Sequence, residues 1–347
     1  MAQLLITGGA GFIGSHACLS FLQSGFSLVV IDNYSNGSLE ALRRVTELAG
    51  IKGNSKRLKI IEGDICDSSA LDRAFNNLEE PIKAVVHFAG LKAVGESIRI
   101  PLKYWEMNLN GTLALLKKMS SENCRTLVFS SSATVYGYPK ELPISERSMV
   151  NPVNPYGKTK AALENILLDL FNSESGWRIA SLRYFNPVGA HPSGLIGEDP
   201  SGIPNNLFPF ISQVGIGRRE MLEIFGTDWP TSDGSAIRDF IHVLDLVEGH
   251  EAALELLLNE DPQFLVMNLG SGKGHSVFEV LNSFEKIIGQ RLPHRIVERR
   301  SGDVACSIAD ATFAKERMGW QTKRSLIDMC KDTWTWQKAN PLGYKSN

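Results

Sequence analysis

The sequence predicts an α/β protein that has a doubly wound parallel sheet in its larger part and a smaller C-terminal α/β part. Two observations support this prediction. Short apolar runs alternate with amphipathic helical stretches along much of the chain, and the first apolar run leads directly into a glycine-rich turn and a helix. Such alternation is typical of a parallel sheet that has helices on both faces.

The strands are predicted from runs of Val, Ile, Leu and Ala that are long enough for a strand and too short for a helix. These runs lie at residues 4–6, 28–31, 58–61, 84–88, 126–130, 179–183 and 265–268. After the turn, apolar residues from 13 to 22 recur with the helical period and predict the first helix. Further helices are expected at 38–48, 69–77, 101–122, 155–172 and 243–258.

We expect two domains, the first of them discontinuous. Residues 1–185 plus about 237–270 would form the dinucleotide-binding domain, and residues 186–236 plus 271–347 the substrate-binding domain. A stretch rich in Gly, Pro and Asn, residues 186–204, is too long for an ordinary connection. It follows the carboxyl end of a predicted strand, where ligands of open α/β sheets bind, so we expect it to have a functional role.

The composition fits a soluble enzyme of the cytoplasm. The chain of 347 residues is 43% hydrophobic and 21% charged, and its net charge of −2 gives no electrostatic reason to bind nucleic acid or an anionic membrane. We see no signal peptide and no apolar run long enough to span a membrane. The 5 cysteines are far apart, as expected of reduced thiols, and the 7 histidines lack the spacing of metal ligands, so no bound metal is expected.

The glycine-rich turn predicts a Rossmann-type dinucleotide site. Gly8 permits the tight turn, Gly11 leaves room for a pyrophosphate, and Gly14 lets the helix pack closely, while the helix N-terminus faces the phosphates. The second predicted strand ends at Asp32, whose carboxylate can accept hydrogen bonds from the adenosine ribose. Because this carboxylate repels a 2′-phosphate, NAD is favoured over NADP.

A second pattern, Tyr156-Gly157-Lys158-Thr159-Lys160, places a tyrosine and a lysine four residues apart at the start of an apolar helix. One helical turn brings both side chains to the same face. An ammonium group beside a phenol favours the phenolate, so we expect the pKa of Tyr156 to move down toward neutrality. The pair could then exchange a proton with a substrate hydroxyl. Taken alone, the spacing is weak evidence, because a solvated helix face explains it more simply.

Together these features resemble the extended short-chain dehydrogenase/reductase family. Longer motifs resemble the UDP-glucose 4-epimerases within it, and they lie at residues 87–97 (HFAGLKAVGES), 130–137 (SSSATVYG), 183–192 (RYFNPVGAHP), 202–207 (GIPNNL) and 233–243 (DGSAIRDFIHV). The resemblance covers nearly the whole chain. It implies interconversion of UDP-glucose and UDP-galactose through a 4-keto sugar, with bound NAD and no net redox change.

The resemblance also implies roles for individual residues. Catalysis falls to Tyr156, Lys160 and Ser132. The residues expected to bind NAD are Gly8, Gly11, Phe12, Ile13, Gly14, Asp32, Asn33, Tyr34, Ser35, Asn36, Asp64, Ile65, Phe88, Ala89, Gly90, Lys92, Asn108, Ser132, Tyr156, Lys160 and Phe185. Those expected to bind the UDP-sugar are Lys92, Ser132, Tyr156, Asn186, Asn206, Leu207, Phe225, Arg238, Arg300, Asp303 and Ser307.

Two other functions are compatible with this fold. A nucleotide-sugar 4,6-dehydratase has the same fold and Tyr/Lys pair, but it needs an added acid and base just after the active-site Ser or Thr. This chain has Ala133 and Thr134 there, and neither can act as a carboxylic acid. A catalytically inactive NAD-binding sensor is the second alternative. The presence of Ser132, Tyr156 and Lys160 argues against it.

Two finer expectations concern substrate range and assembly. At the position of Ser307 the family has a residue beside the sugar C2 group, and a small residue there is associated with acceptance of N-acetylated UDP-sugars. The alternative is that another side chain, such as Tyr184 or Leu207, fills this volume. A wide apolar band predicts a homodimer through paired helices, unless the band is buried within one domain. Its residues are Leu109, Leu113, Leu116, Met119, Ala161, Ala162, Leu163, Ile166, Leu167, Leu170 and Phe171.

Overall fold

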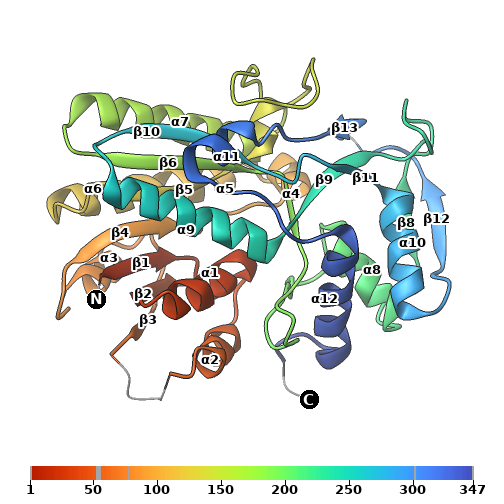
Figure 1. The fold of residues 1–347 in the computed structure, drawn as a ribbon, viewed down its shortest axis with the longest axis horizontal. Helices are drawn as coiled ribbons and strands as arrows, with labels where there is room; N and C mark the ends of the chain where they lie inside the picture. The colour runs from red at the N-terminus through yellow and green to blue at the C-terminus, as the bar shows by residue number, and fades with distance from the viewer. Residues whose placement is uncertain (1, 52–55, 77, 301, 346–347) are drawn as a thin grey trace.

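The computed structural model describes residues 2–51, 56–76, 78–300 and 302–345. Its larger part is a parallel sheet of seven strands in the order β10-β6-β5-β4-β1-β2-β3 (Figure 1). The strands are β1 (Gln3–Thr7), β2 (Ser27–Asp32), β3 (Leu58–Glu62), β4 (Ile82–His87), β5 (Thr126–Ser132), β6 (Arg178–Tyr184) and β10 (Phe264–Leu269). Every strand predicted from the sequence is present close to its expected bounds, so the predicted sheet is confirmed.

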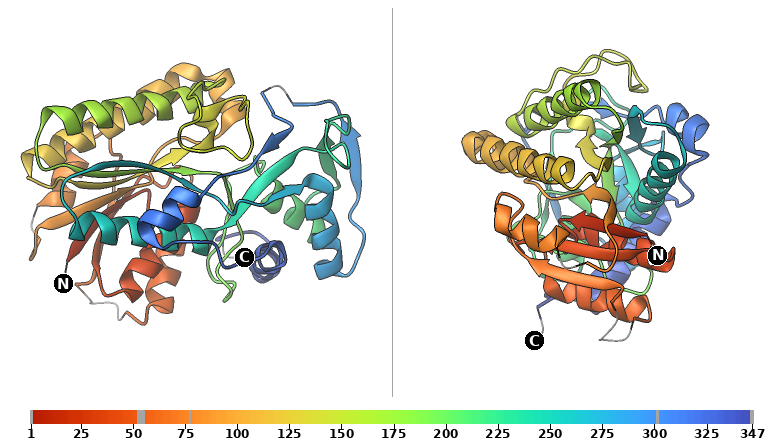
Figure 2. Two further views of the ribbon diagram at one scale, coloured as in Figure 1. Left: turned by 45° about the horizontal axis from the view of Figure 1, so that its top comes forward. Right: turned by 90° about the vertical axis from the view of Figure 1, so that its left-hand side faces the viewer.

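Helices cover both faces of this sheet (Figure 2). Successive residues of β1 face opposite layers, as the strand period requires: Leu4 and Ile6 lie in one apolar core and Leu5 in the other. The first core is covered by α1 (Phe12–Gln23), α9 (Val243–Asn259) and α11 (Thr312–Met318), with α2 (Leu39–Leu48) against α1. The second is covered by α3 (Ser68–Phe75), α6 (Gly111–Ser121) and α7 (Pro155–Ser173).

The helix predicted at 101–122 is not a single α-helix. It consists of α5 (Pro101–Trp105), a π-helical turn η1 (Glu106–Asn110) and α6, and a short helix α4 (Val94–Arg99) precedes it. Apolar periodicity does not distinguish a π-helical turn from the α-helix around it. Such turns often occur at functional sites, and this one carries Asn108.

The smaller part surrounds β9 (Ile237–His242). This strand pairs with β7 (Asn186–Val188), β11 (Gly274–Ser276) and β13 (Cys306–Ser307), while β8 (Leu222–Phe225) pairs with β12 (His294–Val297). The helices α8 (Leu207–Gly215), α10 (Val277–Ile288) and α12 (Leu326–Ala339) enclose a third apolar core with these strands. Helix α10 begins at a capping box formed by Ser276 and Glu279.

The chain passes between the two parts close to the expected domain boundaries. These boundaries assign residues 1–185 and about 237–270 to one domain, and residues 186–236 and 271–347 to the other. The expected return to the large sheet is made by α9 and β10, whereas β9 pairs in the smaller sheet and α11 packs against β10. The two-domain division stays a proposal. The predicted end of helix 69–77 falls at Asn77, which lies outside the described residues.

Among the described residues, no helix is long and apolar enough to cross a membrane, and no group of three potential metal ligands comes together. All five cysteines are free thiols. Part of the apolar band expected at a dimer interface is buried inside one subunit: Leu116, Met119, Leu163 and Leu167 lie in the core beneath α6 and α7.

Candidate active site

The glycine turn between β1 and α1 is closely packed on one side and open on the other. Gly8 has a φ of 70°, and a Cβ added there would lie 2.7 Å from the Ala89 amide nitrogen. A Cβ at Gly14 would lie 2.1 Å from the Gly8 carbonyl oxygen, so neither position accepts a side chain without movement. A Cβ at Gly11 would meet only the Gly8 oxygen, at 3.4 Å. This open space at the N-terminus of α1 fits a pyrophosphate.

Asp32 ends β2 next to this turn, and its carboxylate is fixed by the backbone. Its Oδ2 accepts a hydrogen bond from the Ala10 amide at 2.9 Å and its Oδ1 accepts one from the Tyr34 amide at 2.8 Å. Burial raises the pKa of Asp32, and these two bonds oppose that shift. Each carboxylate oxygen keeps a second lone pair that a ribose hydroxyl can use.

The residues expected around the adenosine are linked to one another. Asn33 donates to Asp64 Oδ2 at 2.8 Å and accepts from the Ser35 amide at 3.0 Å. Asn36 accepts a hydrogen bond from the Ser201 hydroxyl at 2.9 Å, which brings the 186–204 stretch to the ribose turn. The expected functional position of that stretch is therefore supported by a direct contact.

Asn108 connects the loop after β4 to the catalytic helix. Its Oδ1 accepts from the Leu91 amide at 2.8 Å, and its Nδ2 donates to the Leu91 carbonyl at 3.1 Å and to Thr159 Oγ1 at 3.0 Å. A Cβ at Gly90, in the same loop, would lie 3.2 Å from Asn108 Oδ1 and 4.0 Å from Lys160 Nζ. The predicted cofactor loop and Lys160 thus lie together.

Tyr156 lies in the first turn of α7, which Asn154 caps by accepting from the Gly157 amide at 2.8 Å. Ser132 ends β5 and caps the short helix η2 (Ala133–Tyr136). Its Oγ accepts from the amide of Thr134 at 3.2 Å and from its hydroxyl at 2.9 Å, so the Ser132 hydroxyl keeps its own proton to donate. The Ser132 hydroxyl acts to lower the pKa of the Tyr156 phenol, so two of the three predicted catalytic residues lie near each other.

The protonation of the pair differs from the sequence-based expectation. Burial raises the pKa of Tyr156, and the Ser132 hydroxyl only partly opposes this shift. Lys160 is also buried, which lowers its pKa to about 8, and the charge of Glu164 acts in the other direction. Its Nζ donates to the Ser130 carbonyl at 2.6 Å. Desolvation, which the spacing of Tyr156 and Lys160 does not reveal, therefore reverses the direction expected for the Tyr156 pKa.

The residues predicted to bind the UDP-sugar, apart from Lys92, Ser132 and Tyr156, lie in the smaller part. Arg238 donates to the Val304 carbonyl at 2.8 Å and its Nη2 lies 3.9 Å from Asp303 Oδ1. Arg300 pairs with the same carboxylate at 3.3 Å and lies over the Phe225 ring, 5.1 Å from its centroid. Ser307 lies opposite Arg238 in the β13–β9 pair. Asn186 is in β7, while Asn206 and Leu207 begin α8.

Comparison with known proteins places this geometry in a family. A family model described as GDP-mannose 4,6 dehydratase matches residues 5–333. A UDP-glucose 4-epimerase of Bacillus subtilis (strain 168) is 52% identical over 343 residues, covering 99% of both chains, and UDP-glucose 4-epimerase 2 of Arabidopsis thaliana is 50% identical over 345 residues, covering 99% and 97%. The chain belongs to the UDP-glucose 4-epimerase family.

Solved structures of this family agree. The UDP-glucose 4-epimerase of Bifidobacterium longum in complex with NAD+ and UDP superposes with a TM-score of 0.93 at 44% identity, covering 99% of this chain and 100% of that one. The epimerase of Stenotrophomonas maltophila with bound NAD and formylated UDP-arabinopyranose also gives 0.93 at 44% identity, covering 98% and 99%. The predicted family, fold and enzyme class are confirmed.

Two acidic residues of this epimerase family member were not among those predicted. Glu164 follows Lys160 by one helical turn and is buried. Its carboxylate accepts from Arg183 at 2.6 Å and from Ser131, the neighbour of Ser132, at 2.6 Å. An acid four residues after the lysine was the only available signal in the sequence. Glu198, in the long stretch after β7, contacts two predicted ligand-binding residues and is discussed below.

Proposed function

We propose that the protein interconverts UDP-glucose and UDP-galactose by oxidising and then reducing the sugar at C4, with no net redox change. The observation that carries this proposal is the position of Lys160 and of the first turn of α7, which holds Tyr156, at the carboxyl end of β5 next to the loop after β4 and the glycine turn. NAD fits the open space beside Gly11 and the fixed carboxylate of Asp32. When bound, it supplies the group that takes the C4 hydride and returns it.

The chain's own residues then handle the proton and the sugar. Tyr156 takes the proton of the 4-hydroxyl as the C4 hydride leaves, which gives a 4-keto sugar, and gives it back when the hydride returns to the other face. Ser132 can donate its free proton to the same sugar oxygen. Lys160 supplies a positive charge that favours the phenolate. Because the ketone must present both faces, the site has to hold the diphosphate firmly and the hexose loosely.

On the nucleotide side, Arg238 and Arg300 provide guanidinium groups suited to diphosphate oxygens. Both are already oriented by Asp303. The dehydratase reading gains no support from the structure, because Ala133 and Thr134 occupy the positions after Ser132, and the Thr134 hydroxyl donates to Ser132 Oγ.

The direct test is to incubate the purified protein with UDP-galactose without added reductant and to measure UDP-glucose. Appearance of UDP-glucose up to a constant ratio is expected. A 4-keto-6-deoxy sugar as product would support the dehydratase instead, and no conversion by a protein that contains NAD would support the inactive sensor.

We further propose that UDP-N-acetylglucosamine and UDP-N-acetylgalactosamine are also substrates, since Ser307 is small. Of the side chains that could otherwise fill the volume, Tyr184 is buried in the core with its hydroxyl bonded to His250, which leaves Leu207. Shape alone can decide such specificity. Ser307→Tyr should keep the UDP-glucose reaction and lose the N-acetyl one. Wild type without N-acetyl activity would refute the extension.

A cytoplasmic homodimer is also proposed. Several apolar side chains near α5 and α7 are exposed, among them Leu102 at 81%, Ile98 at 50% and Leu168 at 40%. A contact through these helices would cover them. Mass measurement of the purified protein tests this assembly, and a monomer at micromolar concentration would contradict it.

A further inference from the structure

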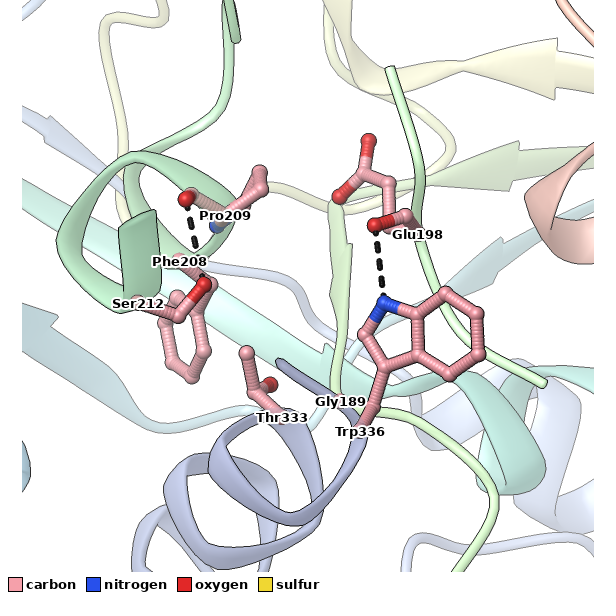
Figure 3. A pocket seen from close by; sticks show the side chains of 7 residues that line it. All are labelled: Gly189, Glu198, Phe208, Pro209, Ser212, Thr333 and Trp336. Carbon is pink, nitrogen blue, oxygen red and sulfur yellow. Dashed lines mark hydrogen bonds between the residues drawn. The ribbon is translucent and has the colours of Figure 1, made fainter. Parts of the chain in front are cut away.

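The long segment between β7 and α8, residues 189–206, is called the strap here. It contains no helix or strand, yet its backbone is held by side chains from the C-terminal region of the chain. The Gly197 amide donates to the Tyr344 hydroxyl at 3.0 Å, and the Trp336 indole donates to the Glu198 carbonyl at 3.2 Å (Figure 3). A Cβ at Gly197 would lie 2.4 Å from the Trp336 ring. The backbone at Glu198 is therefore fixed in place.

The Glu198 side chain reaches two residues that the sequence assigns to ligand binding. Its Oε1 accepts from Lys92 Nζ at 3.2 Å and from Asn206 Nδ2 at 2.8 Å. The Glu198 side chain is only 10% exposed, whereas that of Lys92 is 47% exposed. Lys92 comes from the loop after β4 in the larger part, and Asn206 precedes α8 in the smaller part. One carboxylate oxygen thus joins the two sides of the site.

Asn206 departs from its usual role in a way that supports a binding function. Asparagine at an N-cap normally accepts a hydrogen bond from the first turn of its helix. At α8 the Asn206 side chain makes no capping bond. Its side-chain Nδ2 donates to Glu198 instead. The side-chain oxygen Oδ1 and the first backbone amides of α8 are therefore left for another partner.

We propose that Glu198 is a positioning residue that holds Lys92 and Asn206 in the orientations in which they bind the UDP-sugar, and so couples the cofactor side to the substrate side. This inference rests on the proposed function. A free lysine side chain has many rotamers, so fixing it before the ligand arrives lowers the entropic cost of binding. The cavity beside the Glu198 backbone, about 10 Å³, has room for no more than a water molecule, so it offers no space for the side chain to swing into.

The opposite role can be tested at the same residue. A carboxylate paired with Lys92 could act as an internal competitor that a diphosphate must displace, in which case its removal would strengthen binding. The surroundings of the Glu198 side chain argue against displacement, because the carboxylate is largely buried and would also have to release Asn206. The two roles predict changes of opposite sign in the affinity for UDP.

The experiment compares Glu198→Ala, Glu198→Gln and a matched control, Asp199→Asn. Asp199 is the next residue and carries the same charge, but it accepts from the Tyr344 amide at 2.9 Å and contacts none of the predicted ligand-binding residues in the described interactions. UDP affinity is measured by titration calorimetry on the NAD-containing protein, together with kcat and KM for UDP-galactose. Acid extraction checks that NAD content is unchanged.

We expect Glu198→Ala to weaken UDP about 10- to 100-fold and to raise KM in parallel, since hydrogen bonds to a charged group are lost, while kcat changes less than about threefold. Glu198→Gln keeps the shape and one acceptor, so it should fold even if alanine does not, and should weaken UDP about threefold. When the change Lys92→Met is already present, the further change Glu198→Ala should reduce the affinity for UDP by a markedly smaller factor. Asp199→Asn should stay near wild type.

Tighter UDP binding, unchanged affinity in both Glu198 variants, or an equal loss in Asp199→Asn would each overturn the proposal. The last result would mean that the strap is merely loosened. Wild type is assayed first: if it neither binds UDP nor converts UDP-galactose, the proposed function fails and this inference fails with it, whereas normal wild type with normal Glu198 variants refutes this inference alone.

Discussion

The proposed cofactor side of the site and the proposed nucleotide-sugar side consist of different kinds of groups. At the ends of β1, β2 and β4, the site consists of backbone and short side chains whose geometry allows little change, such as Gly14 against Gly8 and Asp32 against two amides. In the smaller part, long side chains such as Arg238 and Arg300 come from separate segments and are held by ion pairs. The first arrangement suits a ligand that stays, and the second a ligand that comes and goes.

This contrast makes changes on the two sides separable. Variants of the rigid side should alter which cofactor is kept, and variants of the long side chains should alter KM for the UDP-sugar while cofactor content is unaffected. Variants of Tyr156 and Lys160 should alter the chemical step.

The largest effect is expected for Tyr156→Phe, because only the hydroxyl that moves the proton is deleted. Loss of a general acid–base group typically costs a factor of about 100 to 10,000 in kcat. The fold and the NAD content should be preserved, as judged by circular dichroism and acid extraction. A variant that keeps wild-type turnover would remove Tyr156 from the mechanism.

Arg238→Met should raise KM for UDP-galactose about 10- to 100-fold through lost charge-assisted hydrogen bonds to the diphosphate. NAD content should not change, because Arg238 lies on the nucleotide-sugar side and not on the cofactor side. Steady-state kinetics and nucleotide extraction on one preparation give both values. Loss of NAD in this variant would show that the two sides are not separable.

Asp32→Asn tests the rigid side. The wild-type protein should contain NAD or NADH with little NADP, because the carboxylate repels a 2′-phosphate. In the variant, we expect the ratio of NADP to NAD after incubation with both nucleotides to rise about tenfold, in keeping with the loss of one repulsive charge. Chromatography of the nucleotides released by acid extraction measures this ratio. NADP as the main nucleotide of the wild type would contradict the role of Asp32.

The smallest effect expected is a shift in pH dependence for Lys160→Met. Burial raises the pKa of Tyr156. In general, an ammonium group beside a phenol favours the phenolate. Without the Lys160 ammonium, nothing from that side chain opposes the effect of burial. The pKa of Tyr156 should therefore rise further, and its ionisation should need a higher pH. We expect the rising limb of kcat/KM to move up by about one pH unit. An unmoved limb in an active variant would show that Lys160 acts only by binding.

The sequence predicts the cofactor side better than the nucleotide-sugar side, and the reason is physical. Fully buried strands and a glycine turn follow from local chemistry, so β1, β2 and the Gly8 to Gly14 turn are found where expected. Strands of two or three residues, such as β13 and β11, exist only because β9 lies beside them. The contacts of Glu198 join residues more than a hundred positions apart in one case, which no local pattern records.

The remaining differences have the same origin. The raised pKa of Tyr156 depends on burial by distant segments, and the burial of Leu163 and Leu167 in their own domain depends on how α7 meets the sheet. Motif resemblance supplied the proposed catalytic residues. It could not supply Glu164, which lies on α7 and pairs with Arg183 on the strand β6.

The order of the strands has a consequence for how the chain is made. Strand β10, which ends at Leu269, pairs with β6, which ends at Tyr184, and β13 at Ser307 pairs with β9. A ribosome must therefore deliver residue 269 before the edge of the large sheet is covered, and residue 307 before the small sheet is complete. Each sheet therefore needs a strand that is synthesised after segments of the other part. A nascent chain stalled near residue 240 would lack β10, so the edge of β6 would be unpaired and would need protection from aggregation.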